Sequence, residues 1–188
     1  MEKKTLIINL IGAPGTGKST LMAQIFALLK WKSIDCEMVS EFAKELVWAD
    51  RKKTFKDEMY IFSKQNHKLF MVNGQVDVII TDRPLMLTIP YSRKYGNKEF
   101  PEYYKALEKM VIETHNLYNN VNIMLERVKP YNPNGRNQSE EEAKELATLF
   151  EDCLNEFGIP YNKYSALPSL AELIVENIEE HLKIKQNY

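Results

Sequence analysis

The hydrophobic positions of the chain form short apolar runs that alternate with longer segments of helical periodicity. Five runs have the length and composition of buried strands, at residues 5–11, 34–40, 76–81, 121–127 and 161–165. Apolar residues at helical spacing predict helices near residues 18–30, 41–49, 56–73, 101–118, 139–157 and 169–184. Ser139 with Glu142 three residues later predicts a capped start for the fifth helix. This alternation is typical of an α/β protein with a five-stranded parallel sheet.

The segment between the first predicted strand and the first predicted helix carries the phosphate-binding signature G-x-x-x-x-G-K-[ST]. Its glycines let the backbone wrap around an anion, and the first helical turn adds its positive dipole end. Lys18 is expected to reach the β- and γ-phosphates, and Ser19 to bind Mg²⁺ with Thr20 beside it. A turn that binds no nucleotide would need neither the lysine nor the hydroxyl. The predicted nucleotide-binding residues are Gly12, Ala13, Pro14, Gly15, Thr16, Gly17, Lys18, Ser19 and Thr20.

This loop, in its strand–loop–helix context, predicts a three-layer P-loop NTPase fold, and the polar segment after the fourth predicted strand adds the expectation of a kinase-type lid. The length of 188 residues suits a single domain that spans the whole chain, residues 1–188. The formal net charge of -1 argues against a general electrostatic binder of nucleic acid. Charge is nevertheless uneven, because residues 1–138 hold 21 Lys and Arg against 15 Asp and Glu, whereas residues 139–188 hold 4 against 11. A basic face near an anionic ligand is therefore an open expectation.

Cysteine usage and the charged start of the chain favour a cytoplasmic protein. Cys36 and Cys153 lie in no C-x-x-C or Cys/His metal spacing, which suggests reduced thiols. No apolar run approaches the length of a membrane span, and the first strand follows so closely that no signal peptide is expected. No membrane partner is predicted, and a homodimer stays open.

Asp82 and Arg83 directly follow the third predicted strand. In a parallel sheet the ligand lies outside the carboxyl ends of the strands, where a P-loop enzyme holds Mg²⁺ with a Walker B carboxylate. Asp82 is predicted to be that carboxylate, and Arg83 to hold a phosphate or the acceptor. The structural alternatives are a helix cap for Asp82 and a surface ion pair for Arg83.

Glu41 follows the second predicted strand and is expected at the mouth of the same crevice. A carboxylate there would accept the proton of an attacking hydroxyl, or would orient the acceptor or a metal-bound water. The alternative from spacing alone is a first-turn acidic residue in a helix that Ser40 caps.

The polar segment after the fourth predicted strand is the one long irregular stretch of the sequence. Arg127 follows the strand, and Arg136 lies farther along the segment, which makes residues from about 129 to 140 a candidate lid. Cations on a closing loop would neutralise charge on the transferred phosphoryl group while water is excluded. Solvated loop charge is the alternative for both arginines.

Residues 91–104 combine several tyrosines with Arg93, Lys94 and Lys98. Aromatic rings there would stack on a base and the cations would meet phosphate. The alternative is that the tyrosines pack a helical hairpin with their hydroxyls in water.

Taken together, the phosphate loop, the Ser-Glu-Phe-Ala-Lys-Glu segment at residues 40–45, the Thr-Asp-Arg turn at 81–83 and the Pro-Tyr-Asn-Pro-Asn-Gly-Arg stretch at 130–136 resemble an AAA-like P-loop family. That family includes the ribosylnicotinamide kinase domain of NAD biosynthesis and many phage proteins. The resemblance implies that Glu41 lies near the acceptor and that Arg136 belongs to the lid. At residues 82–83 nicotinamide-type kinases tend to carry Asp-Thr, and the Asp-Arg found here looks more like deoxynucleoside kinases. Phage relatives that phosphorylate 5-hydroxymethyluracil in DNA keep a polymeric acceptor open.

The resulting hypothesis is an ATP-dependent kinase that uses Mg²⁺ and acts on a hydroxyl of a nucleoside-like or nucleotide-like acceptor. A DNA-modification kinase that acts on a hydroxymethylated base is the first alternative. A P-loop ATPase or GTPase without an acceptor is the second. The sequence disfavours a GTPase, because Asn97-Lys98 and Asn162-Lys163 are not continued as the guanine-binding motif Asn-Lys-x-Asp. It also disfavours an ATP-driven motor protein, because Asp82 is not followed by the Glu expected after the third strand.

Overall fold

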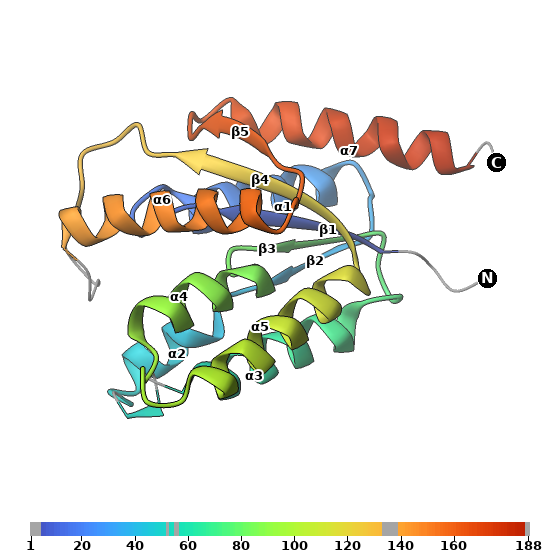
Figure 1. Ribbon diagram of the computed structural model, residues 1–188. Helices are drawn as coiled ribbons and strands as arrows, with labels where there is room; N and C mark the ends of the chain where they lie inside the picture. The colour runs from blue at the N-terminus through green and yellow to red at the C-terminus, as the bar shows by residue number, and fades with distance from the viewer. Residues whose placement is uncertain (1–4, 52, 55–56, 133–138, 187–188) are drawn as a thin grey trace.

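A parallel five-stranded sheet forms the centre of the protein. The computed structural model describes residues 5–186 except residues 52, 55, 56 and 133–138. All strand pairs are parallel, and the strand order is β2-β3-β1-β4-β5 (Figure 1). The strands are β1 (Leu6–Ile11), β2 (Cys36–Val39), β3 (Val78–Thr81), β4 (Asn119–Glu126) and β5 (Asn162–Ser165). The predicted α/β fold with a five-stranded parallel sheet is confirmed.

Helices cover both faces of the sheet and complete three layers (Figure 1). One face carries α1 (Lys18–Trp31) and α7 (Leu170–Gln186), which pack against each other. The other face is covered by α3 (Glu58–Val72), α4 (Thr88–Tyr95), α5 (Pro101–Asn116) and α6 (Glu140–Glu156). The short helix α2 (Phe42–Trp48) follows β2 and packs on α3.

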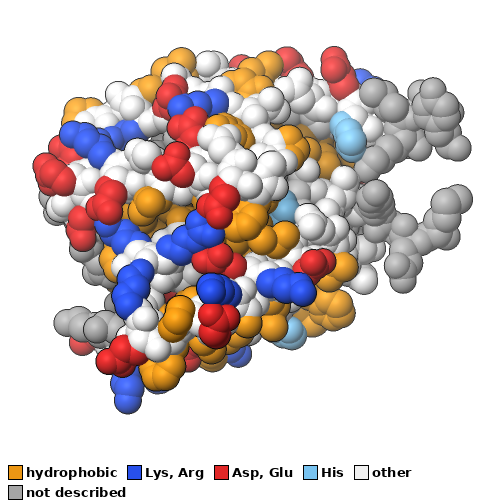
Figure 2. Space-filling view, viewed as in Figure 1, with side chains coloured by type: hydrophobic (Ala, Val, Ile, Leu, Met, Phe, Trp, Pro, Cys, Tyr) orange, Lys and Arg blue, Asp and Glu red, His pale blue; other side chains and the backbone are white. Residues whose placement is uncertain are grey.

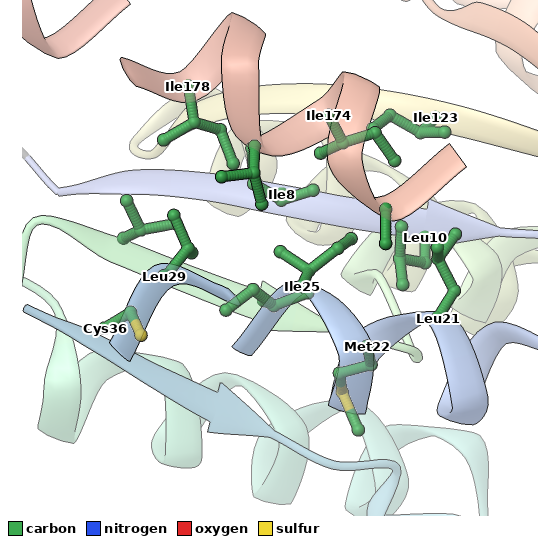
Figure 3. Close-up of a cluster of buried hydrophobic side chains, with 14 of the residues drawn as sticks. Ile8, Leu10, Leu21, Met22, Ile25, Leu29, Cys36, Ile123, Ile174 and Ile178 are labelled. Atoms are coloured by element: carbon green, nitrogen blue, oxygen red, sulfur yellow. The ribbon is translucent and has the colours of Figure 1, made fainter. Parts of the chain in front are cut away.

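The alternation of side chains along β1 divides the core between the two faces. Leu6, Ile8 and Leu10 pack among residues of α1 and α7, and Figure 3 labels Ile8 and Leu10. Ile7 and Ile11 contribute to the clusters on the opposite face. This is the period of two that a strand imposes. The central strand is therefore apolar on both sides, as expected for a parallel sheet covered by helices.

Asn9 interrupts the apolar pattern of β1. Its side-chain amide donates hydrogen bonds to the Oδ1 atoms of Asn120 and Asn122 on β4, at 2.8 and 3.0 Å. The amides of β4 are bonded in turn to backbone carbonyls, Asn120 to His115 and Asn122 to Pro160. The polar groups are thus satisfied within the sheet, so Asn9 is accounted for structurally.

One part of the fold was absent from the sequence prediction. A 3-10 turn, η2 (Leu85–Leu87), leads directly into α4, where no helix was predicted. Pro90 would disfavour the interior of a helix, but here it lies in the first turn of α4, where a backbone N–H has no partner within the helix. The predicted cap of α6 is confirmed, since Ser139 and Glu142 form a reciprocal capping box.

The state of the two cysteines and the character of the helices bear on the expectations drawn from composition. Cys36 and Cys153 are both buried and free. In the described part of the chain, no helix has the length and apolar character needed to cross a membrane.

Candidate functional site

The phosphate-binding segment forms the connection between β1 and α1, at the carboxyl end of the sheet. Gly15 and Gly17 have φ angles of 89° and 94°, in the left-handed region that favours glycine. A Cβ on Gly12 would lie 2.8 Å from Thr16 Oγ1 and 3.1 Å from the carbonyl oxygen of Leu125. The conformation therefore depends on these glycines, as the motif predicts.

The start of α1 is electrostatically prepared for an anion. Gly17 occupies the N-cap position with no side chain capping the helix, and the first turn contains no acidic residue. Lys18 folds back over the loop, and its Nζ donates to the carbonyl oxygens of Gly12 and Ala13 at 2.6 and 3.2 Å. The helix dipole and this ammonium group consequently place positive potential at one point of the loop.

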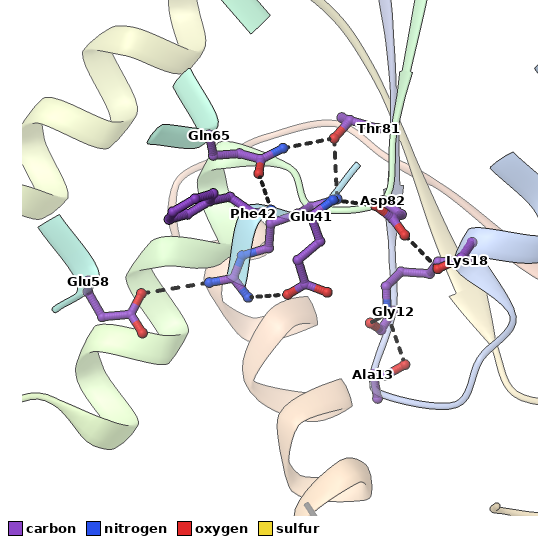
Figure 4. A network of polar contacts seen from close by, with 11 residues as sticks. Gly12, Ala13, Lys18, Glu41, Phe42, Glu58, Gln65, Thr81 and Asp82 are labelled. Carbon is purple, nitrogen blue, oxygen red and sulfur yellow. Dashed lines mark hydrogen bonds and ion pairs between the residues drawn. The ribbon is translucent and has the colours of Figure 1, made fainter. Parts of the chain in front are cut away.

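Asp82, which follows β3, connects the phosphate loop to the segment after β2 (Figure 4). Its Oδ2 accepts a hydrogen bond of 2.6 Å from the hydroxyl of Ser19, and its Oδ1 accepts one of 3.0 Å from the backbone N–H of Glu41. The carboxylate caps no helix, because the N-cap residue of η2 is Pro84. Three segments distant in sequence thus meet at one carboxylate.

The pair formed by Ser19 and Asp82 is suited to a hard divalent cation. Mg²⁺ prefers oxygen ligands and is commonly held by one or two carboxylates together with phosphate oxygens and water. A hydroxyl and a carboxylate oxygen 2.6 Å apart, beside a phosphate-binding loop, provide such a donor set.

Glu41 does not occupy the first-turn position, behind a Ser40 cap, that spacing alone left as the alternative. It occupies the N-cap position itself, and its side chain makes no capping hydrogen bond. The carboxylate is 29% exposed and lies 3.6 Å from Nη1 of Arg83. Its backbone is held by Asp82 while its side chain extends from the helix end. The carboxylate is therefore positioned without being used in the helix cap.

Arg83 is buried and not part of a surface ion pair. Its side chain is only 5% exposed, and its guanidinium carbon lies 4.0 Å from the centre of the Tyr91 ring. One nitrogen faces Glu41, and Nη2 lies 3.7 Å from Oε2 of Glu58 in the first turn of α3. Burial raises the pKa of Tyr91 to about 12, so the phenol is neutral near pH 7. We call Arg83, Glu41, Glu58 and Tyr91 the Arg83 cluster.

Glu58 was missed by sequence reasoning. An acidic residue in the first turn of a helix is common, and Asp57 caps α3 by accepting from the N–H of Tyr60, so nothing in the pattern marks Glu58 as unusual. Only its burial, at 7% exposure of the side chain, distinguishes it. Burial raises the pKa of its carboxyl to about 7, while Arg83 opposes the increase.

Gln65 of α3 holds this side of the site together (Figure 4). Its side-chain oxygen accepts from the backbone N–H of Phe42 at 2.9 Å, and its amide nitrogen donates to Thr81 Oγ1 at 3.4 Å. Helix α3 is thereby fixed to the start of α2 and to the end of β3. This residue was also absent from the sequence prediction, because a polar residue within a helix gives no local signal.

Of the two arginines assigned to the predicted lid segment, Arg127 lies among the described residues. Arg127 forms an ion pair of 2.6 Å with Glu140 at the start of α6, and its guanidinium lies 5.2 Å from the ring of Tyr131. Its Nη1 is buried without a hydrogen-bond partner among the described residues. Arg136 and half of the candidate lid, residues 133–138, lie outside the described residues.

The aromatic and basic segment largely packs a helical hairpin of α4 and α5. Arg93 pairs with Glu108 of α5 and Glu156 of α6, and Lys94 pairs with Glu145 of α6. On the face seen in Figure 2, basic and acidic side chains are interspersed. These cations are neutralised by neighbouring carboxylates and do not support contact with phosphate.

Comparison with solved structures places the fold among known proteins. The crystal structure of NadR protein in complex with NR superposes with a TM-score of 0.65 at 17% identity, covering 92% of this chain and 51% of that chain. NadR protein in complex with NAD and AMP-PNP superposes with a TM-score of 0.64 at 16% identity, covering 92% and 49%. The chain thus spans about half the length of these proteins, and the likeness shows the P-loop NTPase fold.

Sequence comparison gives the family. The search of curated proteins finds no match. A family model described as an AAA domain matches residues 7–167, which include the phosphate loop, Glu41, Asp82 and Arg127. Because the match covers most of the sequence, the chain belongs to this AAA domain family of P-loop proteins.

Proposed function

We propose that the protein is an ATP-dependent kinase that transfers the γ-phosphoryl group to a hydroxyl of a nucleoside-like or nucleotide-like acceptor. The observation that carries the proposal is the bridge made by Asp82. It joins Ser19 of the phosphate loop to Glu41 at the start of α2, which brings a phosphate-binding element and a partly exposed carboxylate to one site. A P-loop kinase requires these two elements side by side.

In the proposed reaction the acceptor hydroxyl oxygen bonds to the γ-phosphorus while the bond to the oxygen bridging to the β-phosphate breaks. Lys18 and the N-terminus of α1 stabilise the phosphate charge, and Glu41 orients the hydroxyl and receives its proton. Ser19 and Asp82 would hold Mg²⁺, which supplies charge neutralisation when bound. Phosphoryl transfer depends mainly on such positioning and charge.

We further propose that residues 1–188 form a single kinase domain with a lid near residues 129–140. Arg127 stands at the beginning of that segment, and Arg136 within it. Arg127 would have to leave Glu140 to reach a phosphoryl group, so Arg136 is the first candidate for the cation that closes on the transferred group.

The comparisons support ATP as donor, since one related structure is named as a complex with AMP-PNP. The name of the other, a complex with NR, makes a nicotinamide nucleoside a reasonable acceptor to test. A hydroxymethylated base in phage DNA is a weaker candidate, because Arg93 and Lys94 are paired with carboxylates.

The test is incubation of the full chain with γ-labelled ATP, Mg²⁺ and a panel of nucleosides, nucleotides, nicotinamide riboside and DNA that contains 5-hydroxymethyluracil. Label transferred to a small molecule supports the proposed kinase. Label transferred only to DNA supports the base kinase instead. Release of labelled phosphate that no acceptor stimulates would refute both and indicate an ATPase.

A further inference from the structure

Arg83 lies midway between two carboxylates and is hydrogen-bonded to neither. Its nitrogens are 3.6 Å from Oε1 of Glu41 and 3.7 Å from Oε2 of Glu58. Charge-assisted hydrogen bonds between guanidinium and carboxylate are usually about 2.7–2.9 Å long. The guanidinium is also stacked on Tyr91. The two ion pairs are therefore nearly equal in length, and neither is short enough to be a charge-assisted hydrogen bond.

Glu58 makes no compensating hydrogen bonds through the oxygen that faces Arg83. Its Oε2 is buried and accepts no hydrogen bond from the described residues. A buried carboxylate without such partners is costly, so a purely structural role would be served better by an apolar side chain. The position of Glu58 on α3, which Gln65 fixes to β3 and α2, holds the carboxylate opposite Glu41.

We propose that Glu58 is a positioning residue that prevents Arg83 from closing a hydrogen-bonded ion pair on Glu41. The Glu41 carboxylate then stays open toward the acceptor hydroxyl. This inference rests on the proposed function, in which Glu41 meets the acceptor. Without the negative charge of Glu58, only Glu41 attracts the Arg83 guanidinium. The Arg83–Glu41 pair then shortens to a hydrogen bond, because shorter, charge-assisted contacts are stronger.

The surroundings of Glu58 make its charge sensitive to pH. Arg83, Glu41 and Asp57 are the charged groups that act on the carboxyl of Glu58, and Tyr95 acts on Tyr91 beside them. Burial raises the pKa of Glu58 to about 7, Arg83 opposes this, and Glu41 and Asp57 add to it. Acidification below neutral pH should therefore release Arg83 toward Glu41 in the wild-type protein.

The direct test is a crystal structure of Glu58→Gln in the full chain, which needs no acceptor. We expect the distance from Arg83 Nη1 to Glu41 Oε1 to shorten from 3.6 Å to about 2.9 Å. An unchanged distance in the variant would overturn the inference. Should the variant fail to fold, wild-type structures below pH 6 and above pH 8 make the same comparison, with closure expected only at the lower pH.

The kinetic test uses the acceptor that the wild-type protein phosphorylates in the panel. In Glu58→Gln we expect kcat/KM for that acceptor to fall by about 10- to 100-fold, the effect of a misplaced reacting group, while affinity for AMP-PNP stays unchanged. The variant should also lose the wild-type dependence of this rate on pH near 7. Equal loss of AMP-PNP affinity, or an unchanged pH profile, would contradict the proposal.

Asp57→Asn is the matched control. It removes the neighbouring carboxylate, which is exposed, and asparagine still caps α3. We expect this variant to keep the wild-type Arg83 position and the dependence on pH near 7, shifted only slightly to lower pH, because Asp57 makes the smallest of the contributions to the pKa of Glu58. If no acceptor in the panel is phosphorylated, the proposed function fails while the crystal structures still decide the role of Glu58.

Discussion

The phosphate loop and the Arg83 cluster lie on the two sides of Asp82 and are built in opposite ways. The loop is one contiguous segment whose glycines, lysine and serine act through backbone geometry and position in sequence. The Arg83 cluster combines α2, α3, β3 and α4, and its geometry depends on burial and on matched ion pairs. A local motif can specify a binding loop for a common ligand, whereas the side that we propose meets the acceptor is assembled from distant segments.

The largest effect is expected on the phosphate side, from Lys18→Ala. Loss of the ammonium group removes a charge from the β- and γ-phosphates, so the rate of phosphoryl transfer should fall by ~100-fold or more in a folded protein. Transfer of label from γ-labelled ATP measures the rate, and circular dichroism checks the fold. Wild-type activity in this variant would remove the loop from the mechanism.

Glu41→Gln separates the two sides of the site. The substitution keeps the size of the side chain and removes the charge on the acceptor side, so kcat/KM for the acceptor should fall by about 100-fold, the scale of general-base catalysis. Affinity for AMP-PNP, measured by calorimetry, should stay close to wild type. A parallel loss of nucleotide binding would assign Glu41 to the metal or to the fold.

Asp82→Asn tests the residue that joins the two sides. The amide oxygen still accepts from the N–H of Glu41, but a neutral group is a weaker partner for a cation and its waters. The Mg²⁺ concentration that gives half-maximal activity should rise several-fold, by a titration of activity against Mg²⁺. An unchanged titration would leave Asp82 with a structural role.

The last prediction concerns stability instead of activity and separates the Arg83 cluster from the loop. The pKa of Glu58 in the folded protein, about 7, lies above its ordinary value of 4.5, so the folded state favours the protonated carboxyl. This contribution is complete below pH 4.5 and is lost as the pH rises through 7. Between these values the free energy of unfolding of wild type should fall relative to Glu58→Gln by on the order of 3 kcal/mol.

Urea unfolding at several pH values measures this difference. His115 titrates in the opposite sense, because burial lowers its pKa to about 4, but it is present in both proteins and cancels in the comparison. Asp57→Asn should keep the shape of the wild-type curve with at most a small shift to lower pH, since Asp57 is the smallest contribution to the pKa of Glu58. Parallel curves for wild type and Glu58→Gln would show that the carboxyl of Glu58 has an ordinary pKa.

The sequence by itself determined the sheet, the order of strands and helices, the phosphate loop and the family. These features are encoded locally, in short continuous apolar runs, in helical spacing, in the capping box of α6 and in the spacing of Gly12, Gly17, Lys18 and Ser19. Helix α4 was missed because Pro90 is a poor signal for a helix, although its first-turn position makes it compatible with one.

Only the tertiary structure decided how the residues beyond the loop are used. Asp82, Glu41 and Arg83 were selected from sequence because they follow strands, yet the pattern did not distinguish bridging, capping and surface roles. Burial and distance made that distinction, since Asp82 bonds to two segments and Arg83 is enclosed by Glu58 and Tyr91. Glu58 carried no signal at all, because its environment arises only when α3, β3 and α4 pack together.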